Sequence, residues 1–223
     1  MSTFNIVAAS NESTVVAEYK PESKRSEQYQ SEAALENEFI RMLSEQGYER
    51  LTIHDEKSLI SNLRVKIEQL NDYQFTDKEW ERFFSNYIAN ANEGIEEKTR
   101  TIQDDHVKTL QRDDGSTKNI KLIDKKNIHN NRLQVLNQYE VSEDDGAKHD
   151  NRYDVTILVN GLPLVHVELK RRGVAIREAF NQINRYQRDS FWSGCALYEY
   201  VQIFVISNGT HTKYYSNTTR NAH

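Results

Sequence analysis

The chain has 223 residues, 28% of them charged, and a formal net charge of −5, so it is long enough for one large domain or two small ones. The negative balance argues against a free-standing DNA-binding protein that relies on a basic surface. No apolar run approaches the roughly 18 residues that span a bilayer, and the single Cys195 excludes an internal disulfide or a cysteine zinc cluster. We expect no signal peptide, no membrane partner and a cytoplasmic protein.

Three helices are predicted after a polar, aperiodic arm over residues 1–30. Apolar side chains recur at helical spacing in each of them, and Ser31 and Thr76 are suitable N-caps for the first and the third. The predicted helices cover residues 31–46, 56–71 and 77–88. Residues 90–102 are predicted to be a connector.

The apolar pattern changes to a period of two after residue 106, which is typical of strands. Predicted strands cover residues 106–112, 118–123 and 132–141, the two arms of a hairpin within 153–172, and residues 200–206 and 212–215. One helix is inserted at 174–189. Helices followed by strands with an inserted helix indicate an α+β or α/β fold with a mixed sheet. We therefore expect one domain over residues 31–223, with amino-terminal helices at 31–90 and a sheet and helix at 106–215.

The predicted hairpin has an apolar side chain at nearly every odd-numbered position. These residues are Val155, Ile157, Val159, Val165, Val167 and Leu169. These residues share one buried face only if the sequence numbers of any two residues that pair across the hairpin add to an even value. A two-residue turn at Asn160-Gly161 gives an odd value. We therefore predict a loop with an odd number of residues, most simply a three-residue turn with Gly161 in a left-handed conformation.

On this register Asp154, His166, Glu168 and Lys170 share the opposite face at one end of the hairpin. Two neighbouring carboxylates repel unless a cation lies between them, and Mg²⁺ prefers one or two carboxylates together with water and phosphate oxygens. Lys170 would orient or activate a water molecule and offset charge on a phosphate. A salt bridge at the strand end is the alternative. For His166, a supporting role and simple packing both remain open.

The helix that follows the hairpin places Gln182 and Tyr186 four residues apart on one face. Arg185 and Arg188 lie close to them, and residues 168–188 contain six basic and two acidic residues, a local net charge of +4. An amide, a phenol and arginines in this arrangement are suited to hold a phosphodiester backbone. An aromatic at the edge of the core and a solvated, charged helix face are the alternative.

The spacing of Asp154, Glu168-Leu169-Lys170 and Gln182-xxx-Tyr186 resembles the PD-(D/E)XK nuclease superfamily, in its RecB-like branch with a QxxxY motif. Over nearly its whole length the chain is similar to the restriction (R, HsdR) subunit of type I restriction-modification enzymes, IC-like group. Three stretches carry this similarity: NRYDVTILVNGLPLVHVELKRRGVAIREAFNQINRY, YQSEAALENEFIRMLSEQGYE and KLIDKKN. The resemblance implies a restriction-endonuclease-like mixed β-sheet flanked by helices. It also implies a Mg²⁺-dependent endonuclease that acts on double-stranded DNA.

The resemblance assigns roles to the residues of these motifs. It implies that Asp154 and Glu168 bind Mg²⁺ and that Lys170 serves the water nucleophile. It further implies that Gln182 and Tyr186 assist, either by contacting DNA or by supporting the catalytic residues.

The superfamily usually adds a glutamate from the first helix, and two candidates lie one turn apart there. We prefer Glu32, which matches the SEA-x-LE opening, and place Glu36 second. Tyr153 stands where the superfamily has a proline before the aspartate, a departure that changes nothing in the chemistry.

R subunits of the family carry an ATP-dependent helicase motor behind the nuclease, and they work with modification (M) and specificity (S) subunits. This chain contains no GxxxxGK[ST] phosphate loop, so we expect the motor domains to be absent from it and ATP to act only in the full-length subunit. Translocation by the motor would bring DNA to this domain and supply the affinity that an acidic nuclease lacks. The competing hypothesis is a catalytically silent nuclease-fold module that docks the motor or the methyltransferase core.

Overall fold

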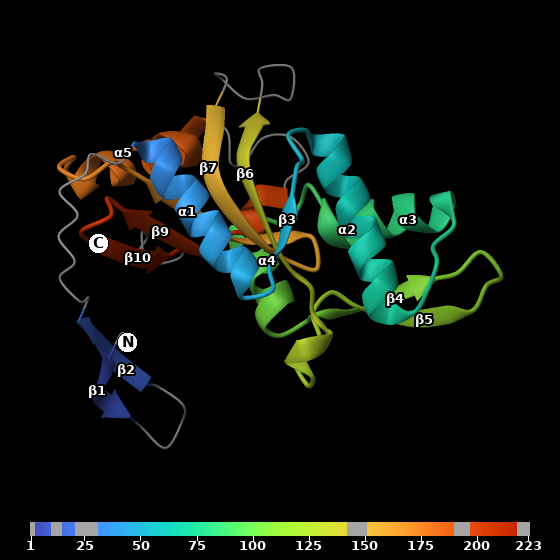
Figure 1. Ribbon diagram of the computed structural model, residues 1–223. Coiled ribbons are helices and arrows are strands. Elements are labelled where there is room, and N and C mark those ends of the chain that lie inside the picture. The colour runs from blue at the N-terminus through green and yellow to red at the C-terminus, as the bar shows by residue number, and fades with distance from the viewer. Residues whose placement is uncertain (1–2, 10–14, 21–30, 142–150, 190–196, 218–223) are drawn as a thin grey trace.

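The computed structural model describes residues 3–9, 15–20, 31–141, 151–189 and 197–217 (Figure 1). Its centre is a six-stranded sheet in the order β10-β9-β8-β7-β6-β3. These strands are β3 (Glu49–Leu51), β6 (Leu133–Val141), β7 (Asn151–Val159), β8 (Leu162–Leu169), β9 (Ile203–Ser207) and β10 (Thr212–Ser216). Two neighbouring pairs, β3 with β6 and β8 with β9, run parallel and the others antiparallel. The mixed sheet confirms the predicted fold class.

Helices cover both faces of this sheet (Figure 1). They are α1 (Glu32–Glu45), α2 (Glu56–Asn71), α3 (Asp77–Phe83) with a π-helical continuation at Phe84–Ile88, α4 (Ile95–Gln103) and α5 (Ile176–Asp189). On one face, Ile40 and Leu43 of α1 pack against alternate strand residues such as Val135 and Val155. The other four helices contribute to a larger core on the opposite face. None of the described helices is long and apolar enough to cross a membrane.

Helix α4 corrects the prediction of a connector over residues 90–102. The backbone N–H of Gly94 donates to the Glu97 side chain at 3.0 Å, which closes the amino-terminal end of the helix. Lys98 is fully buried and forms an ion pair with Glu199 of the 3₁₀ turn Leu197–Tyr200. Contacts with distant parts of the chain therefore stabilise a helix that its own apolar pattern does not indicate.

Residues 1–30, expected to be a polar and aperiodic arm, contain an antiparallel hairpin. Its strands are β1 (Thr3–Ala9) and β2 (Val15–Lys20), which pair with each other in a two-stranded sheet. The arm prediction was wrong for these segments because β-branched residues such as Ile6 and Val15 favour an extended backbone. The rest of the arm lies outside the described residues.

The other expected strands are present, with changed limits. The predicted hairpin around residues 113–116 forms β4 (Val107–Gln111) and β5 (Thr117–Lys121), a separate two-stranded sheet beside α2 and α3. The strand predicted at 200–206 begins at Ile203, because a 3₁₀ turn precedes it.

The turn between β7 and β8 differs from the prediction. Val159 pairs with Leu162, so the loop contains only Asn160 and Gly161. Their φ angles are 51° and 84°, as a two-residue type I′ turn requires. The predicted three-residue loop is therefore wrong, although Gly161 is left-handed as expected.

A β-bulge at Leu164 restores the register that the apolar pattern requires. Leu158 pairs with Pro163, whereas Ile157 pairs with Val165, so Leu164 is the extra residue. A bulge of one residue reverses the face on which the following side chains lie. Five of the six odd-numbered apolar residues consequently belong to the core beneath α1; they are Val155, Ile157, Val165, Val167 and Leu169.

Asn160 explains why the turn is short. Its side chain is fully buried and donates to the Leu122 carbonyl at 3.0 Å and to Asn131 Oδ1 at 2.8 Å. The backbone N–H of Arg132 donates to Asn160 Oδ1 at 2.8 Å. These contacts with a distant segment hold the turn residue in its left-handed conformation, and they cannot be read from the hairpin's own sequence.

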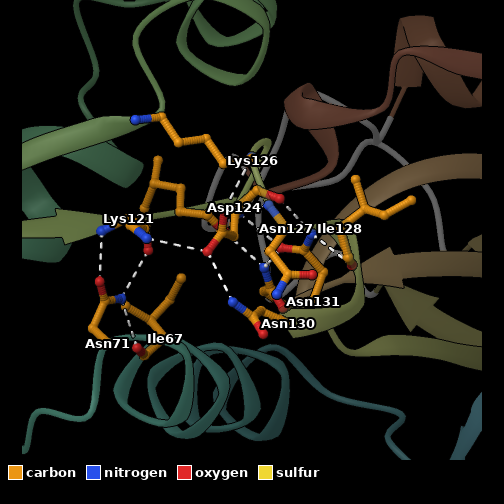
Figure 2. A network of polar contacts seen from close by, with 11 residues as sticks. Ile67, Asn71, Lys121, Asp124, Lys126, Asn127, Ile128, Asn130 and Asn131 are labelled. Carbon is orange, nitrogen blue, oxygen red and sulfur yellow. Dashed lines mark hydrogen bonds and ion pairs between the residues drawn. The ribbon is translucent and has the colours of Figure 1, made fainter.

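The side chain of Asn160 contacts the loop over residues 122–132, and the polar groups of this loop converge on the carboxylate of Asp124 (Figure 2). Its Oδ1 accepts from the backbone N–H groups of Lys126 (3.1 Å) and Asn127 (3.0 Å), and its Oδ2 accepts from Asn130 Nδ2 (3.0 Å) and Lys121 Nζ (3.1 Å). The donated hydrogen bonds, that of Asn127 first, hold the pKa of Asp124 well below its usual value. Asp124 is therefore an anchor for this loop and is not part of the carboxylate pair on the sheet.

The variant Gly161→Ala should destabilise the protein by several kcal/mol. A Cβ on Gly161 would lie 2.6 Å from Leu63 Cα, a backbone atom of α2 that cannot move aside. Gly115→Ala is the matched control, since Gly115 has a similar φ of 82° but no atom within 4 Å of the place where a Cβ would lie. The control should cost only the left-handed strain of about 1–2 kcal/mol. Urea unfolding of both variants measures the difference, and equal losses would contradict the close packing of the turn on α2.

Candidate active site

The two carboxylates of the hairpin lie where β7 and β8 separate. The last paired residues are Val155 and Val167, so Asp154 and Glu168 are the next residues to face each other. Asp154 Oδ2 accepts the backbone N–H of Leu169 at 2.9 Å. A side chain thus replaces a strand-to-strand hydrogen bond at this point and fixes the position of Asp154.

Lys170 joins this pair from the end of β8. Its Nζ lies 2.9 Å from Glu168 Oε1, and its side chain is largely buried. The backbone N–H of Lys170 donates to the Ser207 carbonyl at 2.8 Å, so the neighbouring strand β9 holds the residue in place. The structure therefore brings together the three residues Asp154, Glu168 and Lys170 that the sequence singled out.

The first helix contributes Glu32 to the same place. Glu32 Oε1 accepts the backbone N–H of Arg171 at 3.4 Å, and its charge raises the pKa of Glu168. Glu36 is buried one turn further along α1 and accepts a hydrogen bond from Asn137 Nδ2 of β6. Of the two candidate glutamates, Glu32 is the one that lies beside the carboxylate pair.

Burial and mutual repulsion change the acidity of the carboxylates. Burial, and then the charge of Glu168, raise the pKa of Asp154 to about 7. Burial also raises the pKa of Glu168 to about 7, although Lys170 opposes this shift. Burial alone would lower the pKa of Lys170, but the Glu168 and Asp154 carboxylates outweigh it and raise that pKa. The site thus combines two carboxyls that resist ionisation with an ammonium that retains its proton.

Gln182 and Tyr186 of α5 support the backbone beside Asp154. The Gln182 side chain donates to the Tyr186 hydroxyl, which itself donates to the Arg152 carbonyl at 2.8 Å. Tyr186 is almost fully buried, and burial raises its pKa above the usual value. Arg185 is exposed and its guanidinium lies 5.5 Å from the centre of the Tyr186 ring. The side chain of Arg188 lies outside the described residues.

Tyr153 shows where strand alternation fails. It has an odd number, yet its ring lies on the face of His166, with 5.5 Å between the ring centres. The pairing of β6 with β7 skips Gln138 and Asp154, and Gln138 has a φ of 54°. This local irregularity turns Tyr139 and Tyr153 toward the larger core. The departure from alternation depends on β6, so the hairpin sequence did not indicate it.

The carboxylate pair fits a hard divalent cation. No N–H or hydroxyl group of the described residues donates to Glu168 Oε2, although this atom is buried. Such an oxygen beside a second carboxyl is suited to a cation, and Mg²⁺ commonly uses one or two carboxylates and keeps several waters. The described residues include no group of three or more His, Cys, Asp or Glu arranged to hold a metal ion. Asp154 and Glu168 would therefore be its only side-chain ligands of these types in the described part of the chain.

A separate cavity of about 1190 Å³ lies elsewhere in the fold, and none of the candidate site residues lines it. Its walls come from α2 and the residues 72–74 after it, from residues 128–133, from Gly47 and Glu49, and from Val159 at the far end of β7. The candidate active site thus lies at the ends of β7 and β8, where the side chains of Asp154, Glu168 and Lys170 meet, and not in this cavity.

Comparison with known proteins gives a consistent set of relatives. Residues 29–223 match the family model described as type I restriction enzyme R protein N terminus. The chain is 49% identical over 215 residues to the type I restriction enzyme EcoprrI endonuclease subunit of Escherichia coli, covering 96% of this chain and 67% of that protein. It is 44% identical over 194 residues to the SauMSSORF170P endonuclease subunit of Staphylococcus aureus, covering 85% of this chain and 20% of that protein.

A more distant relative matches a shorter part of the chain. It is the putative type I restriction enzyme MjaIXP endonuclease subunit of Methanocaldococcus jannaschii, 35% identical over 105 residues, which cover 46% of this chain and 10% of that protein. The chain therefore spans two thirds of the length of the E. coli relative and one fifth of the staphylococcal one.

Proposed function

This chain belongs to the family of type I restriction enzyme R protein N termini, and from that membership we propose that it is a Mg²⁺-dependent endonuclease domain that hydrolyses phosphodiester bonds of double-stranded DNA. The observation that supports the proposal best is the convergence of Asp154, Glu168 and Lys170 at the separating ends of β7 and β8. An ion pair formed only for stability has no need of two buried carboxyls whose pKa values are both raised to about 7.

Asp154 and Glu168 would hold the cation, which when bound acts as a Lewis acid on a phosphate oxygen and lowers the pKa of a bound water. Lys170 has a more limited role than a general base, because its raised pKa keeps it protonated. Its ammonium orients Glu168 and offsets negative charge that develops on the phosphate. Glu32, whose charge raises the pKa of Glu168, would accept a hydrogen bond from such a water molecule.

Gln182 and Tyr186 act behind the carboxylates and do not need to touch DNA. Their hydrogen bonds end on the Arg152 carbonyl, two residues before Asp154. Arg185, by contrast, is exposed and carries charge at the surface of α5, so contact with the phosphate backbone falls to it and to Arg188. Phosphate contacts of this kind position DNA without reading its sequence.

In the longer subunit, we propose that an ATP-dependent helicase part translocates DNA toward this domain. The chain spans one fifth of the staphylococcal relatives, which leaves length for such a motor. Modification (M) and specificity (S) subunits complete the proposed assembly, and the domain itself binds no ATP. A net charge of −5 is compatible with a nuclease whose DNA affinity is supplied by its partners.

The decisive experiment is DNA cleavage by the assembled enzyme carrying Glu168→Ala. We expect cleavage to fall at least about 100-fold, because charge stabilisation by a bound metal is worth several kcal/mol, while ATP hydrolysis persists. Glu81→Ala, at an exposed position on α3, is the matched control and should leave cleavage unchanged. Normal cleavage by the Glu168→Ala enzyme would contradict the proposal and favour a catalytically silent module.

A further inference from the structure

The two oxygens of Glu168 have different surroundings. Oε1 receives the Lys170 ammonium at 2.9 Å, whereas Oε2 lies 3.6 Å from Nε2 of His166. Both Glu168 and His166 are completely buried. The imidazole is therefore close to the one oxygen of Glu168 that Lys170 does not hold, at a distance just beyond that of a formed hydrogen bond.

Aromatic rings enclose His166 and fix the plane of its ring. Tyr153, Tyr186 and Phe204 meet it edge to face, with ring centres 5.5 Å, 6.0 Å and 6.3 Å away. On the strand, His166 pairs with Thr156 of β7 and with Phe204 of β9. These rings pack around a completely buried imidazole whose Nε2 lies on the side of Glu168 Oε2, and close packing of this kind restrains its orientation.

The imidazole of His166 can offer the carboxylate a hydrogen-bond donor. A neutral imidazole has one N–H donor and one acceptor nitrogen. The tautomer with the proton on Nε2 presents that donor to Glu168 Oε2. A carboxylate oxygen has a second lone pair, which stays available for another partner.

We propose that His166 is a positioning residue, whose Nε2–H group orients Oε2 of Glu168 toward a divalent cation held between Glu168 and Asp154. The proposal rests on the proposed function, since it assigns the cation to that same carboxylate pair. His166 contacts neither the DNA nor the cation. It acts through Glu168, as groups that hydrogen-bond to metal ligands do when they fix the direction of a ligand atom.

Calorimetric titration of the chain with Mn²⁺ tests this role without relying on catalysis. His166→Met removes the donor but keeps a bulky apolar side chain, whereas His166→Gln keeps an N–H donor near the position of Nε2. We expect the Met variant to bind Mn²⁺ about 10- to 100-fold more weakly than wild type, and the Gln variant to recover a large part of the loss. Equal affinities of the Gln and Met variants would overturn the proposal, because a purely structural role does not distinguish them.

Two further variants keep the experiment decisive. If His166→Met does not fold, His166→Asn replaces it, since its shorter amide is polar like that of Gln but does not reach Oε2; equal affinities of Asn and Gln would overturn the role. Glu168→Ala separates this proposal from the proposed function. If Glu168→Ala binds Mn²⁺ as wild type does, the metal site itself is wrong. If Glu168→Ala loses binding and His166→Met retains it, only the role of His166 is wrong.

Discussion

Lys170→Met is expected to lower the rate of DNA cleavage by the assembled enzyme by about 100- to 1000-fold, the loss typical when one group that stabilises transition-state charge is removed. The reason is the position of the ammonium, 2.9 Å from Glu168 Oε1 and largely buried. A methionine of similar length fills the space but supplies neither the charge nor the hydrogen bond. Cleavage of plasmid DNA, measured beside ATP hydrolysis, separates loss of the chemical step from loss of assembly.

Two control variants sharpen this prediction. Arg171→Met removes a neighbouring, exposed cation and should leave the rate close to that of wild type. Lys170→Arg retains the charge, but the guanidinium is planar and wider than an ammonium, so we expect it to restore little activity at a buried position. A Lys170→Met enzyme that cuts at the wild-type rate would show that the ammonium has no part in the reaction.

Asp154→Asn is expected to stabilise the domain at pH 8 in the absence of divalent cations. The pKa of Asp154 is raised from 3.8 to about 7, so ionising this carboxyl costs the folded state on the order of 2–4 kcal/mol. The amide carries no charge, its oxygen can still accept the Leu169 N–H, and its NH₂ group can donate to Glu168. The variant therefore exchanges a repulsion for a hydrogen bond.

The sign of this effect depends on pH in a defined way. Below about pH 4 the carboxyl is protonated in both the folded and the unfolded states, so it costs nothing. Between pH 4 and 7 the unfolded state releases its proton first, and wild-type stability falls; above pH 7 the full cost is present. Urea unfolding in EDTA at pH 4.5, 6 and 8 should show the advantage of Asp154→Asn growing across this window. A variant less stable than wild type at pH 8 would contradict the raised pKa.

Much of the hairpin register was predictable because alternating apolar side chains determine which residues of a strand share a face. The alternation of valine, isoleucine and leucine predicted that Asp154, Glu168 and Lys170 share the face opposite α1. Val155 and Val167 pair with each other beneath α1, as this register requires, whereas Tyr153, beside Asp154, departs from the alternation. The way in which the register arises was not predictable.

The apolar pattern demands an odd number of extra residues, but it does not say where they lie. The structure places the extra residue at Leu164 in the strand, because the buried side chain of Asn160 and the backbone around Leu63 hold a two-residue turn. Those contacts come from segments far away in the sequence. The apolar pattern of the hairpin therefore predicted the correct shared face for its apolar residues, but it predicted the wrong length for the turn.

The choice between Glu32 and Glu36 shows a similar limit. Both lie on one face of α1, one turn apart, and helical periodicity cannot separate them. The difference depends on which residues of the sheet lie next to each glutamate. Asn137 of β6 donates a hydrogen bond to Glu36, whereas the backbone N–H of Arg171, just after Lys170, donates to Glu32. Helix α4 was missed for a comparable reason, since its buried Lys98 pairs with Glu199, which lies 101 residues later in the chain.

The structure distinguishes between two roles for Tyr186 that the sequence could not separate. Four-residue spacing with Gln182 indicated a shared face but left DNA contact and support of the site equally open. The hydrogen bond from the Tyr186 hydroxyl to the Arg152 carbonyl, and the burial of the ring, favour support. An interior phenol cannot be inferred from spacing because burial depends on how α5 packs on the sheet.

DNA cleavage by the assembled enzyme carrying Asp154→Asn is the sharpest test of the proposed metal site, because this substitution is expected to leave the domain folded and more stable. We expect an enzyme that assembles, hydrolyses ATP and translocates, yet fails to cut DNA in Mg²⁺. Cleavage at the wild-type rate by this stable variant would contradict the assignment of the catalytic cation to the Asp154–Glu168 pair.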